Sequence, residues 1–164
     1  MIELKNIFKT VIAPQAAAAI EMLDGAMRIC PDAVWSDGSQ PQFWYVAYHA
    51  LFWLDFYSSE SPNGFAPPPP FDLHEMDPAG LMPKRVFTRD ELRAYADHCR
   101  RKLRAAMESF TEKRAVAVVR YGNMNLAGLE LQVYNLRHVQ HHVGQLALML
   151  RQKANLGAPW VDRV

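Results

Sequence analysis

The chain has 164 residues, of which 50% are apolar and 21% are charged. This length predicts one domain, residues 1–164, with a single core, and the composition excludes a collagen-like, disulfide-rich or disordered protein. Eighteen Lys and Arg against seventeen Asp and Glu give a net charge of +1, which disfavours binding to nucleic acid or to an anionic membrane surface.

Cysteine use and apolar patterning predict the compartment. Cys30 and Cys99 lie far apart in the sequence and form no CxxC motif, and residues 1–5 lack the charged and apolar regions of a signal peptide. The most apolar stretch, Phe43 to Tyr57, is roughly 15 residues long, which is too short to span a bilayer. We therefore expect a protein of the reducing cytoplasm that has no membrane partner.

Four segments show the apolar spacing and the terminal signals of helices. In chain order they cover residues 14–30, 41–57, 88–110 and 126–154. The second is apolar nearly all round, so it is expected in the interior. The third begins with a capping box, in which Thr88 is the N-cap and Glu91 reaches back to it. The fourth is expected to end before Gly157.

The connections complete the predicted architecture. Residues 58–87 contain a Ser-Pro-Asn-Gly turn and four consecutive prolines, so they form a long loop that is either functional or disordered. Such a loop could cover a site as a lid or pack against a second subunit. Residues 115–122 are β-branched and favour a short extended piece. The sequence predicts an all-α, antiparallel or crossover-connected four-helix bundle with this Pro-rich loop between helices two and three.

Three histidines crowd into the fourth predicted helix. On a helical wheel His142 lies about 40° from His138, whereas His141 lies about 60° away on the other side. The apolar arc of the helix includes His142 and has His138 at its edge, while His141 borders the polar arc. We therefore predict that His138 and His142 point inward and that His141 points outward or into an interface.

Two imidazoles on one buried face require partners, because an unpartnered buried polar group costs roughly 1–3 kcal/mol. For this pair alone, hydrogen bonds to carbonyls or water are the commoner solution, and a shared divalent ion is the alternative. His49, midway along the second helix, favours the ion, because a bundle can bring it opposite His138 and His142. Imidazole ligands suit Zn, Ni, Fe, Mn or Co.

The segments Tyr48–Asp55 and His138–Leu146 together resemble the DinB/YfiT-like metalloenzyme superfamily. The family pattern is one His on helix two, followed by H-x-x-H-H-x-G-Q-L on the last long helix. The resemblance spans about residues 15–157. It implies a four-helix bundle with a crossover connection, a homodimer, and a divalent metal (Zn, Ni, Mn or Fe) held by His49, His138 and His142. Members with assigned activities include thiol-dependent transferases and isomerases that act with small thiols.

Two classes of function follow as hypotheses. The first is a metal-dependent enzyme, a thiol-dependent transferase or a hydrolase, that uses a small-molecule thiol or water against an electrophilic substrate. It needs no protein base, since no HExxH motif is present and Asp55 falls about 120° from the direction of His49. The alternative is a non-catalytic metal-binding or stress-associated bundle. A fourth protein ligand would favour this alternative, because structural sites are closed.

The remaining polar residues are given ordinary roles. Gln145 could orient a ligand from outside the coordination shell or bond to a neighbouring helix, and Gly144 is interpreted as a close packing point. His98 is expected to face solvent. His74 lies in the loop among three acidic residues, where a weak second metal site is less expected than a solvated surface. These residues are Asp72, Glu75 and Asp77.

Overall fold

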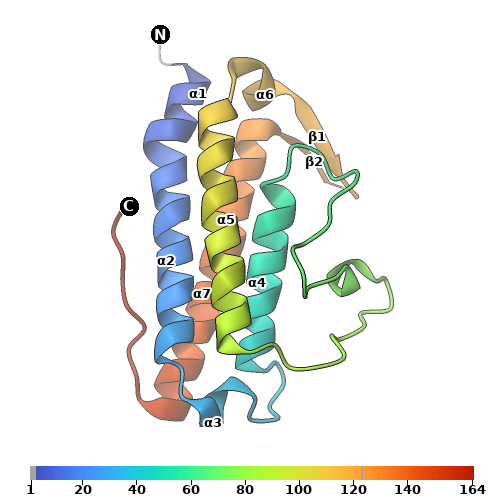
Figure 1. The fold of residues 1–164 in the computed structure, drawn as a ribbon. Helices are drawn as coiled ribbons and strands as arrows, with labels where there is room; N and C mark the ends of the chain where they lie inside the picture. Colours follow the sequence, from blue (N-terminus) through green and yellow to red (C-terminus); the bar gives the residue numbers. More distant parts are fainter. Residues whose placement is uncertain (1–2, 123) are drawn as a thin grey trace.

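The computed structural model describes residues 3–122 and 124–164 and is mainly helical, which confirms the predicted all-α class (Figure 1). In chain order the elements are α1 (Leu4–Ile7), the π-helix η1 (Phe8–Ile12), α2 (Ala13–Ile29), α3 (Asp32–Trp35), α4 (Phe43–Tyr57), the 3₁₀-helix η2 (His74–Met76), α5 (Arg89–Ser109), α6 (Glu112–Val116), β1 (Val118–Tyr121), β2 (Met124–Ala127) and α7 (Gly128–Ala154). The four predicted helices correspond to α2, α4, α5 and α7.

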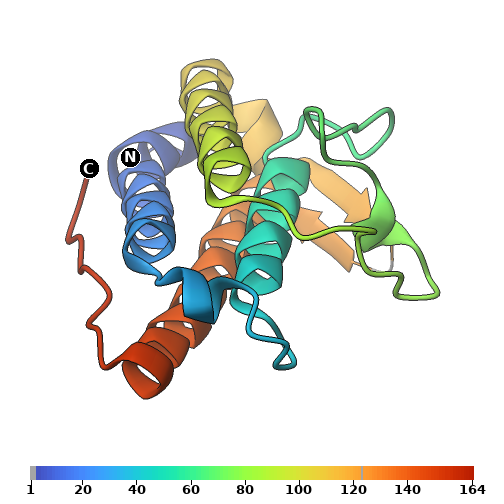
Figure 2. The same cartoon turned by 60° about the horizontal axis from the view of Figure 1, so that its bottom comes forward.

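These long helices lie side by side around one core (Figures 1 and 2). Along the chain, α4 and α5 run in the same direction, whereas α2 and α7 run in the opposite one (Figure 1). Two parallel neighbours require a connection as long as the helices themselves, which explains the length of the loop between α4 and α5. The connection is therefore of the crossover type. None of the described helices is long and apolar enough to cross a membrane.

Helix ends follow local chemistry with two corrections. The capping box is present as predicted: the Thr88 hydroxyl accepts from the backbone N–H of Glu91, and the Glu91 carboxylate accepts from that of Thr88. α7 ends at Ala154, before Gly157 as predicted, but Asn155 and not Gly157 takes the left-handed conformation, with φ 53°. At its start, α7 begins at Gly128, because residues 124–127 pair with β1 in an antiparallel hairpin.

The first helical stretch begins earlier than predicted, at Leu4 rather than near Pro14. Pro14 has no N–H and cannot bond to the carbonyl of Thr10, and the π-helical turn η1 ends two residues before it, at Ile12. The free carbonyl of Thr10 accepts instead from Arg163 at 3.1 Å, in the C-terminal tail that runs beside α2. Because this bond comes from a residue distant in sequence, the local pattern around Pro14 misplaces the start.

The long loop packs against its own chain. Phe71 stacks on Tyr95 of α5 at a centroid distance of 4.4 Å, and Phe87 lies 4.8 Å from Tyr48 of α4. Phe65 packs edge-on against Phe52, also on α4, at 5.5 Å. Three buried or half-buried aromatic anchors thus hold the segment between α4 and α5 on the outer side of α4 (Figure 2).

Candidate metal centre

The structure brings the three predicted histidines together. His49 lies midway along α4, and His138 and His142 lie one turn apart on α7, which packs beside α4. Each offers one ring nitrogen, and these nitrogens all lie within 4.8 Å of one another. The ring centroid of His49 is 5.4 Å from that of His138 and 4.7 Å from that of His142. Residues from two distant stretches of the chain therefore form one group.

Hydrogen bonds define which nitrogen of two rings is free. The Nδ1 of His142 lies 2.8 Å from Oε1 of Gln145, which can only accept, so the proton is on Nδ1. Likewise the Nδ1 of His49 lies 2.6 Å from the carboxylate of Glu75. A ring whose proton is on Nδ1 has its lone pair on Nε2, which is the nitrogen that each ring can then offer to a metal ion. The Nε2 of His142 lies 3.1 Å from the Nε2 of His138.

The two histidines that α7 contributes to the group are held in the uncharged form. Burial, together with the neighbouring rings of His142 and His49, lowers the pKa of His138 to about 3. Burial also lowers the pKa of His142 to about 4. Both rings are therefore neutral at pH 7, which is the form that binds metal ions. The buried Nδ1 of His138 has no hydrogen-bond partner among the described residues.

The donor set of three imidazole nitrogens, and the spacing of the pair on α7, suit a divalent cation. Nitrogen ligands about 2.05 Å from zinc and 3.1 Å from each other subtend an angle of about 100° at the metal, which suits tetrahedral or octahedral coordination. In the part of the chain that the structure describes, no thiolate or carboxylate joins the group. A bound ion would thus have three protein ligands and keep open positions, as catalytic sites do.

Glu75 is a neighbour of the three-histidine group that the sequence analysis missed. The acidic residues around His74 predict a solvated loop, yet the side chain of Glu75 is only 3% exposed and its Oε2 also accepts from Trp53 at 3.3 Å. The local sequence carries no signal for this, because the path of the loop over α4 determines the contact. His74 pairs instead with Asp72, and the single histidine group found among the described residues does not include it.

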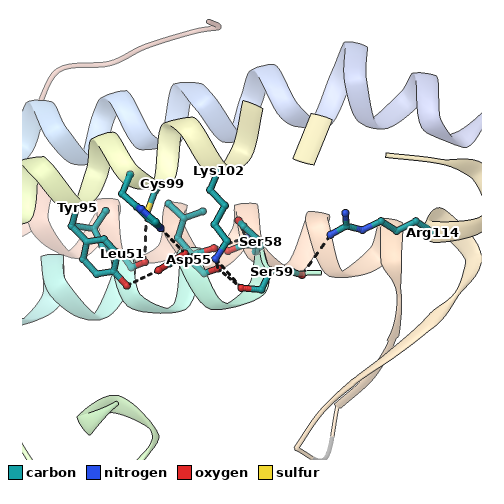
Figure 3. A network of polar contacts seen from close by, with 11 residues as sticks. Leu51, Asp55, Ser58, Ser59, Tyr95, Cys99, Lys102 and Arg114 are labelled. Atoms are coloured by element: carbon teal, nitrogen blue, oxygen red, sulfur yellow. Dashed lines mark hydrogen bonds and ion pairs between the residues drawn. The ribbon is translucent and has the colours of Figure 1, made fainter. Parts of the chain in front are cut away.

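A polar network fixes α4 against α5 (Figure 3). Asp55 is fully buried and accepts from the Tyr95 hydroxyl at 3.0 Å and from the ammonium of Lys102. Lys102 also donates to Ser59 at 2.8 Å. His98 is expected to face solvent, and its side chain is 34% exposed, but its Nε2 also lies 3.2 Å from Asp55, because the parallel helices bring the two side chains together. Asp55 stays outside the three-histidine group, as predicted.

A second contact fixes α4 against α7. The buried amide of Asn135 donates to the carbonyl of Leu54 at 3.3 Å and to the hydroxyl of Ser58 at 3.2 Å. Since α4 is tied on both sides near its C-terminal end, its register is set and His49 is presented toward α7. The position of α4, which is apolar nearly all round, is thus determined by its few polar groups.

Some predictions for the neighbours of the three histidines are confirmed, and one is wrong. His141 is exposed and outside the group, as the wheel predicts. Gln145 could orient a ligand or bond to a neighbouring helix. It contacts His142 on its own helix, which is the contact that an orienting residue needs. Gly144 is exposed, and a Cβ added to it would meet no atom within 4 Å, so its interpretation as a packing point is wrong.

The fold and the site together define an all-α protein that carries three clustered histidines between its second and last long helices. The chain belongs to the DinB superfamily, whose family model matches residues 15–146. Comparison with curated proteins gives no match, and neither does comparison with solved structures.

Proposed function

We propose that this protein is a divalent-metal-dependent enzyme, a thiol-dependent transferase or a hydrolase, that acts on a small electrophilic substrate. The observation that carries the proposal is the three-histidine group, with ring nitrogens within 4.8 Å of one another. In this role His49, His138 and His142 hold the ion. The ion, when bound, lowers the pKa of a coordinated water or thiol and polarises an electrophile.

The chain's own thiols do not support a role as nucleophile. Burial raises the pKa of Cys30 to about 12, and burial raises that of Cys99 well above its usual value. Because the thiolate is the reactive form, both side chains are inert at neutral pH. A small thiol or water from solution is therefore the nucleophile in this proposal.

Substrate would reach the site along α7. A surface hollow of about 540 Å³ borders the group through His138. Arg137 is exposed in this hollow and forms no hydrogen bond or ion pair with the described residues, so its guanidinium is available for an anionic substrate group. The hollow is lined by Tyr134, Arg137, His138, Gln140 and His141.

Metal analysis tests the proposal. We expect chain purified without a histidine tag to contain about one divalent ion, and His138→Ala and His142→Ala to lose most of it. His141→Ala is the matched control, because this neighbouring ring is exposed and outside the group. Wild type that binds no Zn²⁺, Ni²⁺, Mn²⁺ or Fe²⁺ would contradict the proposal.

Turnover distinguishes the enzyme from its alternative. Loaded protein is screened with small thiols and electrophiles, and with hydrolysable esters and amides. Activity that is lost in His49→Ala together with the metal supports the enzyme, whereas a tightly bound ion without turnover favours a non-catalytic metal-binding bundle. The homodimer implied by the family resemblance remains a prediction, which sedimentation equilibrium tests.

A further inference from the structure

The loop between α4 and α5 places one carboxylate directly behind the three-histidine group. Glu75 belongs to η2, and its side chain is 3% exposed. Its Oε2 lies 2.6 Å from the Nδ1 of His49 and 3.3 Å from the indole nitrogen of Trp53. Both donors come from α4, one helical turn apart. Glu75 is therefore docked on the face of α4 that carries His49.

Apart from His49, this carboxylate has no basic side chain as a partner among the described residues. No Lys or Arg of the described chain forms an ion pair with Glu75, and its second oxygen, Oε1, is buried without a hydrogen-bond partner in that same part. Tyr45 also lies beside it, and burial together with the charge of Glu75 raises the pKa of that phenol to about 12. Because burying an uncompensated carboxylate is costly, a positive charge is expected close by.

We propose that Glu75 is a positioning residue for the metal, an inference that rests on the proposed function. By accepting the Nδ1–H of His49 it fixes the tautomer in which Nε2 carries the lone pair, on the side of His138 and His142. Its negative charge makes His49 a stronger donor and partly balances the charge of a bound ion. Glu75 itself does not join the group of ligand atoms, so it acts through His49.

The loop is built to deliver this residue. Phe71 lies before Glu75 in the sequence, and Phe87 after it, and both are buried in the core against Tyr48. Anchors on both sides restrict the path of the segment, so the carboxylate is held at its place beside His49. The crossover loop thus contributes to the metal centre as well as connecting two parallel helices.

Metal affinity tests the inference, measured for Zn²⁺ and Co²⁺ by competition with a chromophoric chelator. We expect Glu75→Ala to weaken binding by about 10–100-fold, which is the usual effect of removing a carboxylate behind a histidine ligand. Glu75→Gln keeps an acceptor but loses the charge, so its loss should be smaller, and Glu75→Asp should recover part of the affinity. Glu60→Gln is the control, because this carboxylate of the same loop is 83% exposed.

A second readout follows the ring directly. In metal-free protein, long-range ¹H–¹⁵N spectra should show His49 as the Nδ1–H tautomer in wild type and as a mixture in Glu75→Ala. If Glu75→Ala fails to fold by circular dichroism, Glu75→Gln decides by its affinity. Wild type that binds neither ion overturns the proposed function and this inference with it. Wild type that binds both ions, with Glu75 variants of equal affinity and unchanged tautomer, overturns this inference alone.

Discussion

The Nε2 atoms of His138 and His142 lie 3.1 Å apart across one turn of α7, with the proton of His142 held on the opposite ring nitrogen by Gln145. Two imidazoles in this relation supply two of the three donor nitrogens before any ion arrives. The third comes from His49 on α4, which packs against α7. Metal binding would therefore link two long helices through a contact that the fold has already shaped.

The contact of Gln145 with His142 predicts a change in affinity. Gln145→Leu removes the acceptor that holds the proton on Nδ1, so we expect Zn²⁺ binding to weaken about tenfold in the chelator competition assay. Gln145→Glu keeps an acceptor and should retain affinity. Gln152→Leu, exposed near the end of the same helix, controls for the added apolar surface. Equal Zn²⁺ affinity of Gln145→Leu and wild type would show that Gln145 has no role in metal binding.

The buried carboxylate of Asp55 predicts a large change in stability. Asp55→Ala leaves the ammonium of Lys102 without its buried partner, so the free energy of unfolding should fall by about 3–5 kcal/mol in urea titrations. Asp97→Ala is the control, since Asp97 is 60% exposed and its pair with Arg100 on the same helix should contribute at most about 1 kcal/mol. Similar losses in the two variants would show that the network in Figure 3 does not stabilise the fold.

Two glycines of α7 predict opposite effects of the same substitution. A Cβ at Gly128 would lie 2.0 Å from the backbone oxygen of Arg114, so Gly128→Ala should destabilise the fold by about 1–3 kcal/mol. At Gly144 the space is open, so Gly144→Ala should stabilise it by about 0.5–1 kcal/mol through helix propensity. Thermal denaturation of both variants measures the difference, and the reverse order would contradict the packing of α6 on α7.

The capping box predicts a dependence on acid. The ion pair with Arg85, together with hydrogen bonds from Thr88, lowers the pKa of Glu91 to about 2 from an ordinary value of 4.5. A carboxyl whose folded-state pKa is lowered stabilises the fold fully above 4.5 and loses that contribution as the pH falls toward 2. The stability difference between wild type and Glu91→Gln should therefore shrink over this range. Glu108→Gln, exposed on the same helix, should show no such trend.

Features encoded within a few residues are those that the sequence predicts well. The capping box at Thr88 is one, and the inward placement of His138 and His142 is another, since helical periodicity alone determines which residues share a face. His49 entered the prediction through its place midway along the apolar second helix, and the family pattern agreed, but its distance from the pair is a tertiary property that only the structure gives. The all-α class follows from the same periodicity.

Features that depend on how helices meet were missed. The sequence does not predict the contact of His98 with Asp55, because nothing on α5 shows that a parallel α4 brings Asp55 beside it. It predicts a solvated Glu75 because the burial of this residue depends on a loop held by distant aromatic side chains.

The residue that ends α7 was missed for a local reason. Asn155 ends the helix because asparagine tolerates the left-handed conformation, although the nearby Gly157 is the more familiar signal.

Helices α4 and α7 are held in register by the bonds from Asn135, which involve none of the three imidazoles. The chain should consequently fold when empty, release its ion to a chelator and take up another without unfolding. Imidazole nitrogens bind several divalent ions. The metal that is available when the protein is loaded would therefore determine which ion is bound, as much as the affinity of the site for each metal does. We expect recombinant batches grown with zinc or with nickel to differ in content accordingly, and emission spectrometry of the two batches shows whether they do.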